Sequence, residues 1–156
     1  MSSIWRKELS KEALTKINNG QYKTLMSNLG MQITEIGSDY LEGTMPIDER
    51  TQQIYGLLHG GASAAFAETL GSFAALLVAG DGKIALGVDL SASHLRGVKS
   101  GTVTGRATPI RIGQSLQVWE IKIHETGNEE AGLVCHSKIT LIVKNSPCPV
   151  VVPPNP

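Results

Sequence analysis

The chain has 156 residues, and 41% of them are apolar, which suits one compact domain and excludes a disordered chain. Its 14 basic and 14 acidic residues balance, so composition gives no basis for binding nucleic acid. The polar N-terminus lacks the apolar core of a signal peptide, and two cysteines, Cys135 and Cys148, are expected to be reduced thiols in a cytoplasmic protein.

Four short elements are expected before residue 50: helices over Lys11–Asn18 and Gln21–Leu29, and strands over Met31–Ile36 and Leu41–Ile47. Ser10 is a suitable N-cap for the first helix, and Gly20 and Gly30 mark the ends of the two helices. Pro46 cannot donate a ladder hydrogen bond, so its side of the second strand should be an edge or a strand end.

The central element is a helix over Gly60–Ala79, ended by the sequence Gly80-Asp81-Gly82. It is apolar nearly all round, which predicts a buried helix rather than a surface one. Glu68, Thr69 and Ser72 make its centre too polar for a good membrane span.

Alternating apolar residues then predict four strands, at Leu86–Ala92, Gly101–Pro109, Trp119–His124 and Leu133–Val143. The short links Lys99-Ser100-Gly101 and Thr126-Gly127-Asn128 suggest antiparallel hairpins. The order of elements predicts an α+β fold, in which about five to six antiparallel strands curve around one long buried helix. Residues 1–144 should form this single domain, and the proline-rich segment 145–156 should be a mobile tail.

The segment Gly56–Ser72, GLLHGGASAAFAETLGS, carries the clearest chemical signal. It places one carboxylate, Glu68, among small apolar residues, where burial is costly unless the group is compensated or functional. Ala64, Glu68 and Ser72 follow an i, i+4 spacing and so share one helix face. Gly60 lies in the first turn of the helix, where free N–H groups and the positive end of the helix dipole can stabilise a developing oxyanion.

This motif and the order of elements resemble the hotdog-fold acyl-CoA thioesterases. The resemblance is strongest to the branch that hydrolyses aromatic acyl-CoA thioesters, such as 4-hydroxybenzoyl-CoA and 1,4-dihydroxy-2-naphthoyl-CoA. It extends roughly from Ile4 to Lys144, with support from TMPIDERTQQIYGLLHGG, GVDLSASHLRG and IRIGQSLQVWEI. The resemblance implies an active site formed between two subunits, hence a homodimer at least and a tetramer of two dimers as the usual assembly.

The resemblance also implies a role for each residue of the motif. Glu68 corresponds to the catalytic carboxylate, and Gly60 to the backbone N–H that polarises the thioester carbonyl. Gln53 and His59 correspond to residues that orient the thioester and the turn, and Ser72 to one that helps to place water. Glu68 can act as a base that activates water or as a nucleophile that forms an anhydride, and the sequence leaves these routes open.

Coenzyme A enters only as part of the substrate, and the resemblance implies no other cofactor. The histidine spacing fits no zinc site, so no metal is expected. The strand ends that correspond to coenzyme A contacts supply Gly87, His94, Leu95, Arg96, Gly97, Arg111, Ile112, Gly113, Gln114, Ser115 and Leu116. Related sequences often carry Arg or His where this chain reads Gln114-Ser115-Leu116, so the phosphate contacts are expected to differ.

Several alternatives stay open at this point. Glu68 could be a structural carboxylate, Ser72 could bond back to a carbonyl one turn earlier, and Arg96 and Arg111 could be solvated charges. At the level of function, the alternatives are a hotdog hydratase or dehydratase and a non-catalytic acyl-CoA-binding module.

Overall fold

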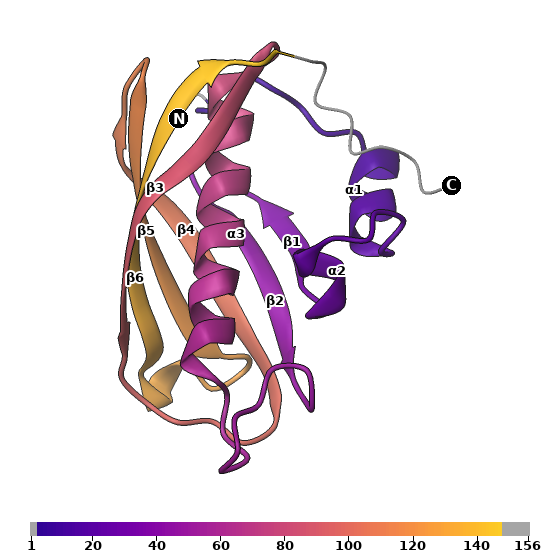
Figure 1. Cartoon of the computed structure of the whole chain (residues 1–156), viewed down its shortest axis with the longest axis vertical. Helices are drawn as coiled ribbons and strands as arrows, with labels where there is room; N and C mark the ends of the chain where they lie inside the picture. The colour runs from indigo at the N-terminus through magenta and orange to yellow at the C-terminus, as the bar shows by residue number, and fades with distance from the viewer. Residues whose placement is uncertain (1–2, 148–156) are drawn as a thin grey trace.

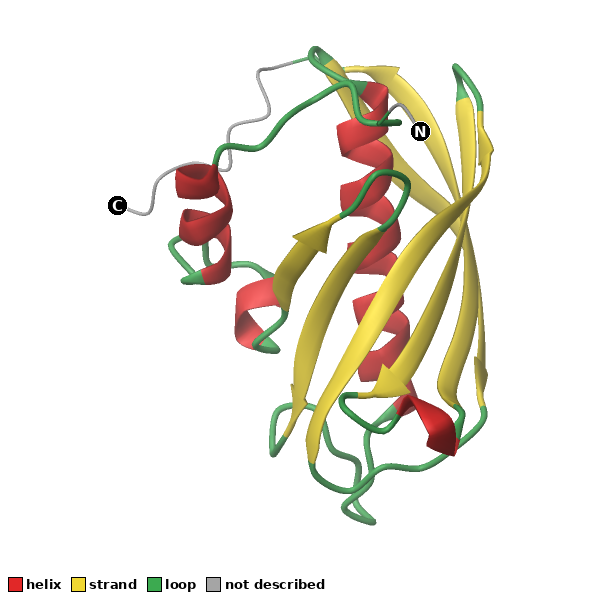
Figure 2. Ribbon diagram, turned by 180° about the vertical axis from the view of Figure 1, so that it is seen from behind, coloured by secondary structure: helices red, strands yellow, loops and turns green. Residues whose placement is uncertain are grey.

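The computed structural model describes residues 3–147, and within them one antiparallel sheet curves around a single long helix (Figure 1, Figure 2). The strand order is β1-β2-β4-β5-β6-β3. The strands are β1 (Gln32–Ile36), β2 (Leu41–Ile47), β3 (Lys83–His94), β4 (Gly101–Ile112), β5 (Leu116–Glu125) and β6 (Leu133–Asn145). The helix in the curve of the sheet is α3 (Gly60–Ala79), so the predicted α+β hotdog architecture is confirmed.

The N-terminal elements form largely where the sequence predicts them. Helix α1 (Lys11–Asn18) has the expected bounds, and the hydroxyl of Ser10 accepts a hydrogen bond from the backbone N–H of Ala13 at 3.1 Å. Helix α2 (Leu25–Asn28) is shorter than predicted, because Thr24 caps it through a capping box with Ser27.

Helix α3 has the predicted bounds and ends at Gly80, whose φ of +84° favours glycine. It lies close to the sheet because Gly105 of β4 has no side chain: a Cβ there would stand 2.6 Å from Leu70 and 2.9 Å from Phe66. By length and composition α3 could cross a membrane, but half of it is buried inside the domain, as is usual for a core helix.

Only one face of α3 is buried against the sheet. Phe66, Ala67, Leu70 and Ala74 are fully buried, together with Trp119, Ile121 and Ile139 of the sheet. The opposite face carries Ala64, Glu68 and Ser72, which are half-buried or exposed. The predicted buried helix is therefore buried on one face only in the single chain.

The predicted hairpin at Lys99–Gly101 is also wrong. Within residues 3–147, strand β3 pairs only with β6 and forms an edge of the sheet, whereas β4 lies between β2 and β5. The link after β3 therefore crosses to the middle of the sheet (Figure 1). The link Thr126–Asn128 does join neighbouring antiparallel strands, β5 and β6, as predicted.

Two further details differ from the sequence predictions. A β-bulge between Gly87 and Asp89 interrupts both the pairing of β3 with β6 and the alternation predicted over Leu86–Ala92, and Val88 is 59% exposed. The predicted tail begins later than residue 145, because Asn145 is the last residue of β6. The rest of that prediction, residues 148–156, lies outside the described residues.

Candidate active site

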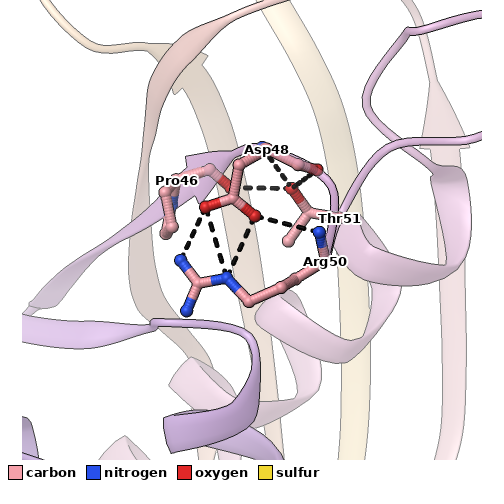
Figure 3. Close-up of polar contacts among 4 residues, drawn as sticks. All are labelled: Pro46, Asp48, Arg50 and Thr51. Atoms are coloured by element: carbon pink, nitrogen blue, oxygen red, sulfur yellow. Dashed lines mark hydrogen bonds and ion pairs between the residues drawn. The ribbon is translucent and has the colours of Figure 1, made fainter.

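A tight turn follows β2 and precedes the loop that leads to α3 (Figure 3). The hydroxyl of Thr51 donates to the carbonyl of Pro46 at 2.8 Å and accepts from the N–H of Asp48 at 3.1 Å. The guanidinium of Arg50 donates to the carboxylate of Asp48 at 2.6 Å, and this bond lowers the pKa of Asp48 below its usual value. Buried Thr51 then holds the next part of the site, because its carbonyl accepts from the N–H of His59 at 2.8 Å.

His59 is the N-cap of α3, and its Nδ1 accepts from the N–H of Gly61 at 2.8 Å. An acceptor at Nδ1 places the proton of the neutral ring on Nε2. His59 thus positions the first turn of the helix.

The backbone N–H of Gly60 has no hydrogen-bond partner among residues 3–147. The imidazole of His94, at the end of β3, lies beside it: a Cβ on Gly60 would stand 2.9 Å from Nε2 of His94. The helix start therefore presents an unpaired donor next to a histidine ring. The sequence assigns His94 to coenzyme A, whereas the structure places it beside the proposed oxyanion donor.

Gln53 lies in the loop that leads into this helix start. Its side-chain oxygen accepts from the N–H of Tyr55 at 2.6 Å, and in the described part of the chain its amide NH₂ group has no partner. The N–H of Leu58 donates to the carbonyl of Val98 at 2.7 Å, which ties this loop to the segment after β3. Gln53, His59, Gly60 and His94 are thus gathered at one end of α3.

Glu68 lies further along α3 and is exposed in the single chain, so its predicted burial is wrong there. The reason is that β3 is the edge strand of the sheet, so no further described strand covers this side of the helix. The carboxylate lies against β3: a Cβ on Gly87 would stand 2.9 Å from Oε1 of Glu68. Glu68 lines a hollow of about 230 Å³ together with the bulged residues Gly87, Val88 and Asp89.

Ser72 lies one turn beyond Glu68 and is half-buried. Its hydroxyl makes no hydrogen bond to any residue that the structure describes, so the back-bonded alternative does not hold for it. Thr69 makes that bond instead, donating to the carbonyl of Ala65 at 2.8 Å. Ser72 lines a second hollow on this face, with Leu76 of α3 and Leu86 of β3.

Gly87 lies beside Glu68, and the other residues proposed to hold coenzyme A fall into two groups at opposite ends of α3. The segment His94–Gly97 lies at the helix start, where Gly97 contacts Leu57. The hairpin Arg111–Leu116 lies at the other end, where Gly113 and Gln114 line a hollow with Ala79. A helix of this length spans about 30 Å, so one chain does not bring the two groups together.

The two arginines of this set differ in environment. Arg96 forms an ion pair with Glu125, 3.0 Å between Nη1 and Oε2, and this contact lowers the pKa of Glu125. The Nε and Nη2 atoms of Arg96 are buried and have no hydrogen-bond partner among the described residues. Arg111 is exposed and has no ion pair within residues 3–147. Arg96 is therefore not a solvated charge, whereas Arg111 is free to meet an anion.

Thr51, the buried residue whose hydrogen bonds hold the turn before α3, was not predicted from the sequence. Its only signal is a threonine three residues after Asp48, a spacing that is also common in ordinary turns. The described residues contain no cluster of three His, Cys, Asp or Glu side chains suited to a metal ion.

Known proteins match the chain over most of its length. The thioesterase superfamily matches residues 55–131. The proofreading thioesterase EntH of Cronobacter turicensis is 45% identical over 140 residues, which cover 90% of this chain and 98% of that protein. A crystal structure of a thioesterase from Haemophilus influenzae is 46% identical, with a TM-score of 0.83 and coverage of 91% and 95% of the two chains. A glutamine-to-alanine mutant of a Pseudomonas aeruginosa thioesterase is 32% identical, with a TM-score of 0.82 and coverage of 92% and 100%.

Proposed function

We propose that this chain, which belongs to the thioesterase superfamily and is an enzyme that hydrolyses thioesters, acts on acyl-CoA thioesters with an aromatic acyl group. The products are the free acid and coenzyme A. The aromatic class rests on the sequence resemblance, and hydroxybenzoyl and dihydroxynaphthoyl groups are its nearest examples. We place the enzyme in the cytoplasm, where acyl-CoA is made, and assign no metal or further cofactor to the reaction.

The observation that carries this proposal is the unpaired N–H of Gly60 at the start of α3. It points out of a helix end whose dipole favours negative charge. A thioester carbonyl that accepts this hydrogen bond becomes more electrophilic, and its oxygen is stabilised as charge develops. One such donor typically lowers a barrier by about 3 kcal/mol. His94 borders the same position and would orient the carbonyl or donate a second hydrogen bond.

Glu68 supplies the other half of the reaction. As a base it takes a proton from water while the water oxygen attacks the carbonyl carbon, and the carbon–sulfur bond then breaks to release the thiolate. As a nucleophile it attacks the carbonyl carbon, the carbon–sulfur bond breaks to release the thiolate, and water hydrolyses the resulting anhydride in a second step. The unpaired hydroxyl of Ser72 supports a role in holding the water in either route.

The spacing of these groups supports a site shared by two subunits. Gly60 and Glu68 are eight residues apart in one helix, which is about 12 Å along its axis. Reacting groups must approach to about 3–3.5 Å. One carbonyl group therefore does not meet the Gly60 N–H and the Glu68 carboxylate of the same chain, and we assign them to different subunits.

The edge of the sheet gives such a partner a place to bind. In the part of the chain that the structure describes, β3 has no neighbour on one side, and its residues Leu86 and Val88 are 48% and 59% exposed. Pairing of two β3 strands would cover these side chains and enclose Glu68. A homodimer formed in this way would also bring the His94–Gly97 segment of one subunit nearer to the Arg111–Leu116 hairpin of the other. We propose this dimer as the minimal unit and a tetramer of two dimers as the full assembly.

Two alternative functions are less well supported. A hydratase or dehydratase of this fold pairs a histidine with an acidic residue for proton transfer to carbon, whereas the relatives are thioesterases. A binding module without turnover would require neither an exposed carboxylate at position 68 nor an unpaired amide at Gly60.

The test is a panel of acyl-CoA esters assayed for free thiol release, with Glu68→Gln as the inactive comparison. Mixed dimers test the shared site. A Gly60→Pro chain lacks the donor N–H but keeps Glu68, and proline is tolerated at the first helical position. Mixing it with Glu68→Gln chains should restore activity, because one of the two sites in each mixed dimer is intact. Failure of every ester would reject the activity, and failure of the mixture alone would reject the shared site.

A further inference from the structure

A cavity of about 390 Å³ lies between the N-terminal segment and α3, away from the Gly60 end of the helix. Its floor is Phe73 and Leu77 of α3, and its roof is Ala13 and Ile17 of α1. Leu9 and Met26 close its sides. In Figure 1, α1 lies beside the upper half of α3.

The roof is anchored at both ends, so the cavity is built into the fold. Trp5 stacks on Trp119 with ring centroids 6.1 Å apart, and the N–H of Lys7 donates to the carbonyl of Leu77 at 3.0 Å. At the other end the side chain of Asn18 bonds the backbone of Ile33 twice, at 2.8 and 2.9 Å. Between these anchors α1 has no buried residue. An apolar hollow of this size, open to solvent and bordered by anchored elements, has the form of a small-molecule site.

The lining indicates what kind of ligand fits. Lys7 is the one charged residue of the lining, and its Nζ is paired with Asp81 at 3.3 Å. The residues that line the cavity therefore include no unpaired charge that could bind a carboxylate or a phosphate. The other lining residues are mostly aliphatic or aromatic, which favours an uncharged apolar group.

The cavity borders the hollow that contains Ser72. Phe73 and Leu76 line both this cavity and the hollow that contains Ser72. Ser72 in turn lies one helical turn from Glu68. From Glu68 to Leu76 the helix rises about 12 Å, which is the length that an acyl group must have to reach the cavity.

We propose that this cavity binds the far end of an extended apolar acyl group, and that α1 thereby determines which acyl groups the enzyme prefers. The inference rests on the thioesterase activity proposed above and adds to it. A single aromatic ring would end short of α1, whereas a medium or long alkyl chain, or a ring on an alkyl spacer, would reach beneath it. The thioester itself is held and cleaved at the Gly60 and Glu68 positions, independently of α1.

The test fills the cavity from its roof. Ala13→Trp places a large side chain in the cavity, and Thr15→Trp places the same side chain on the exposed face of α1. Hydrolysis of benzoyl-, butyryl- and lauroyl-CoA is measured for each variant and for the unchanged enzyme. We expect Ala13→Trp to lower kcat/KM for lauroyl-CoA by at least about tenfold, the scale on which an apolar pocket discriminates. The values for benzoyl- and butyryl-CoA should stay within about twofold of the unchanged enzyme, as should all three values for Thr15→Trp.

A second measurement does not depend on turnover. Glu68→Ala binds lauroyl-CoA without cleaving it, and calorimetry compares its affinity with that of the double variant Glu68→Ala, Ala13→Trp. We expect the second substitution to weaken the binding of lauroyl-CoA and to leave the affinity for butyryl-CoA unchanged. An equal loss for all esters, or none, would overturn the acyl cavity and leave the thioesterase proposal standing. If Ala13→Trp is unfolded, Ile17→Ala should instead raise kcat/KM for lauroyl-CoA relative to butyryl-CoA, and an unchanged ratio would overturn the cavity as well.

Discussion

The carboxylate of Glu68 lies against the α-carbon of Gly87, across the groove between α3 and the edge strand β3. The bulge that follows Gly87 turns Val88 outward at this point. A glycine beside a bulge allows another group to approach the backbone closely. The position of the proposed catalytic carboxylate thus depends on a residue with no side chain.

Gly87→Ala should therefore reduce turnover more than stability. The new Cβ would stand 2.9 Å from Oε1 of Glu68, and the carboxylate, on a flexible exposed side chain, would move away. We expect kcat to fall by about tenfold or more, since misplacement of a reacting group by about 1 Å can cost 100-fold. The melting temperature should change little. Ser91→Ala, on the same strand and exposed, is the control and should keep full activity.

Gly60→Ala should act through His94. The added methyl group would stand 2.9 Å from Nε2 of His94 and displace the ring, while the N–H donor itself is kept. We expect kcat/KM to fall in Gly60→Ala and in His94→Ala. The kcat/KM of the double variant should be no lower than that of the less active single variant. Additive losses would show that the two residues act independently.

Ser72→Ala tests the proposed water-holding hydroxyl, and Thr69→Val is its matched control. Both substitutions remove one hydroxyl from the same face of α3, but only that of Thr69 bonds a helix carbonyl. We expect Ser72→Ala to lower kcat several-fold with unchanged KM and Thr69→Val to leave both values near those of the unchanged enzyme. Equal effects of the two substitutions would show that the Ser72 hydroxyl has no specific role in the mechanism.

Local patterns predicted most of the elements, because each is encoded by nearby residues. Alternation marked β2, β4, β5 and β6, and glycines and caps set the bounds of α1 and α3. The placement of β3 at the edge of the sheet was not predictable in this way. Its residues alternate like those of its neighbours, and pairing with β6 rather than β4 depends on contacts distant in sequence.

The candidate site shows the same limit. The motif around Glu68 identified the carboxylate and the Gly60 amide, because small residues and a lone charge are visible in sequence. The exposure of Glu68 could not be read from its apolar neighbours, because those neighbours face the sheet while Glu68 faces the open side of the helix. Nor could sequence place His94 beside Gly60, since the two are 34 residues apart and meet only through the topology.

Trp5→Ala should destabilise the N-terminal segment. Trp5 stacks on Trp119 at an interplanar angle of 9° and donates from Nε1 to the carbonyl of Gly37. Loss of the stack and the hydrogen bond should lower the free energy of unfolding by about 2 kcal/mol. Trp5→Phe keeps the stack and loses only the bond, so it should cost about half as much. Denaturant unfolding measures both values, and equal losses would show that stacking contributes little.

Asp48→Asn should lower stability in a manner that depends on pH. The bond from Arg50 lowers the pKa of folded Asp48 below its ordinary value of 3.8. A carboxyl group with a lowered folded pKa contributes stability that is fully present above the unfolded pKa and is lost as the pH falls through the folded pKa. We therefore expect the unchanged protein to be more stable than Asp48→Asn from neutral pH down to about pH 4, and this difference to shrink at lower pH. Urea unfolding at a series of pH values measures it, with the exposed Asp39→Asn as the control. A stability difference that stays constant down to the most acidic pH would mean that the ion pair with Arg50 does not hold the turn before α3.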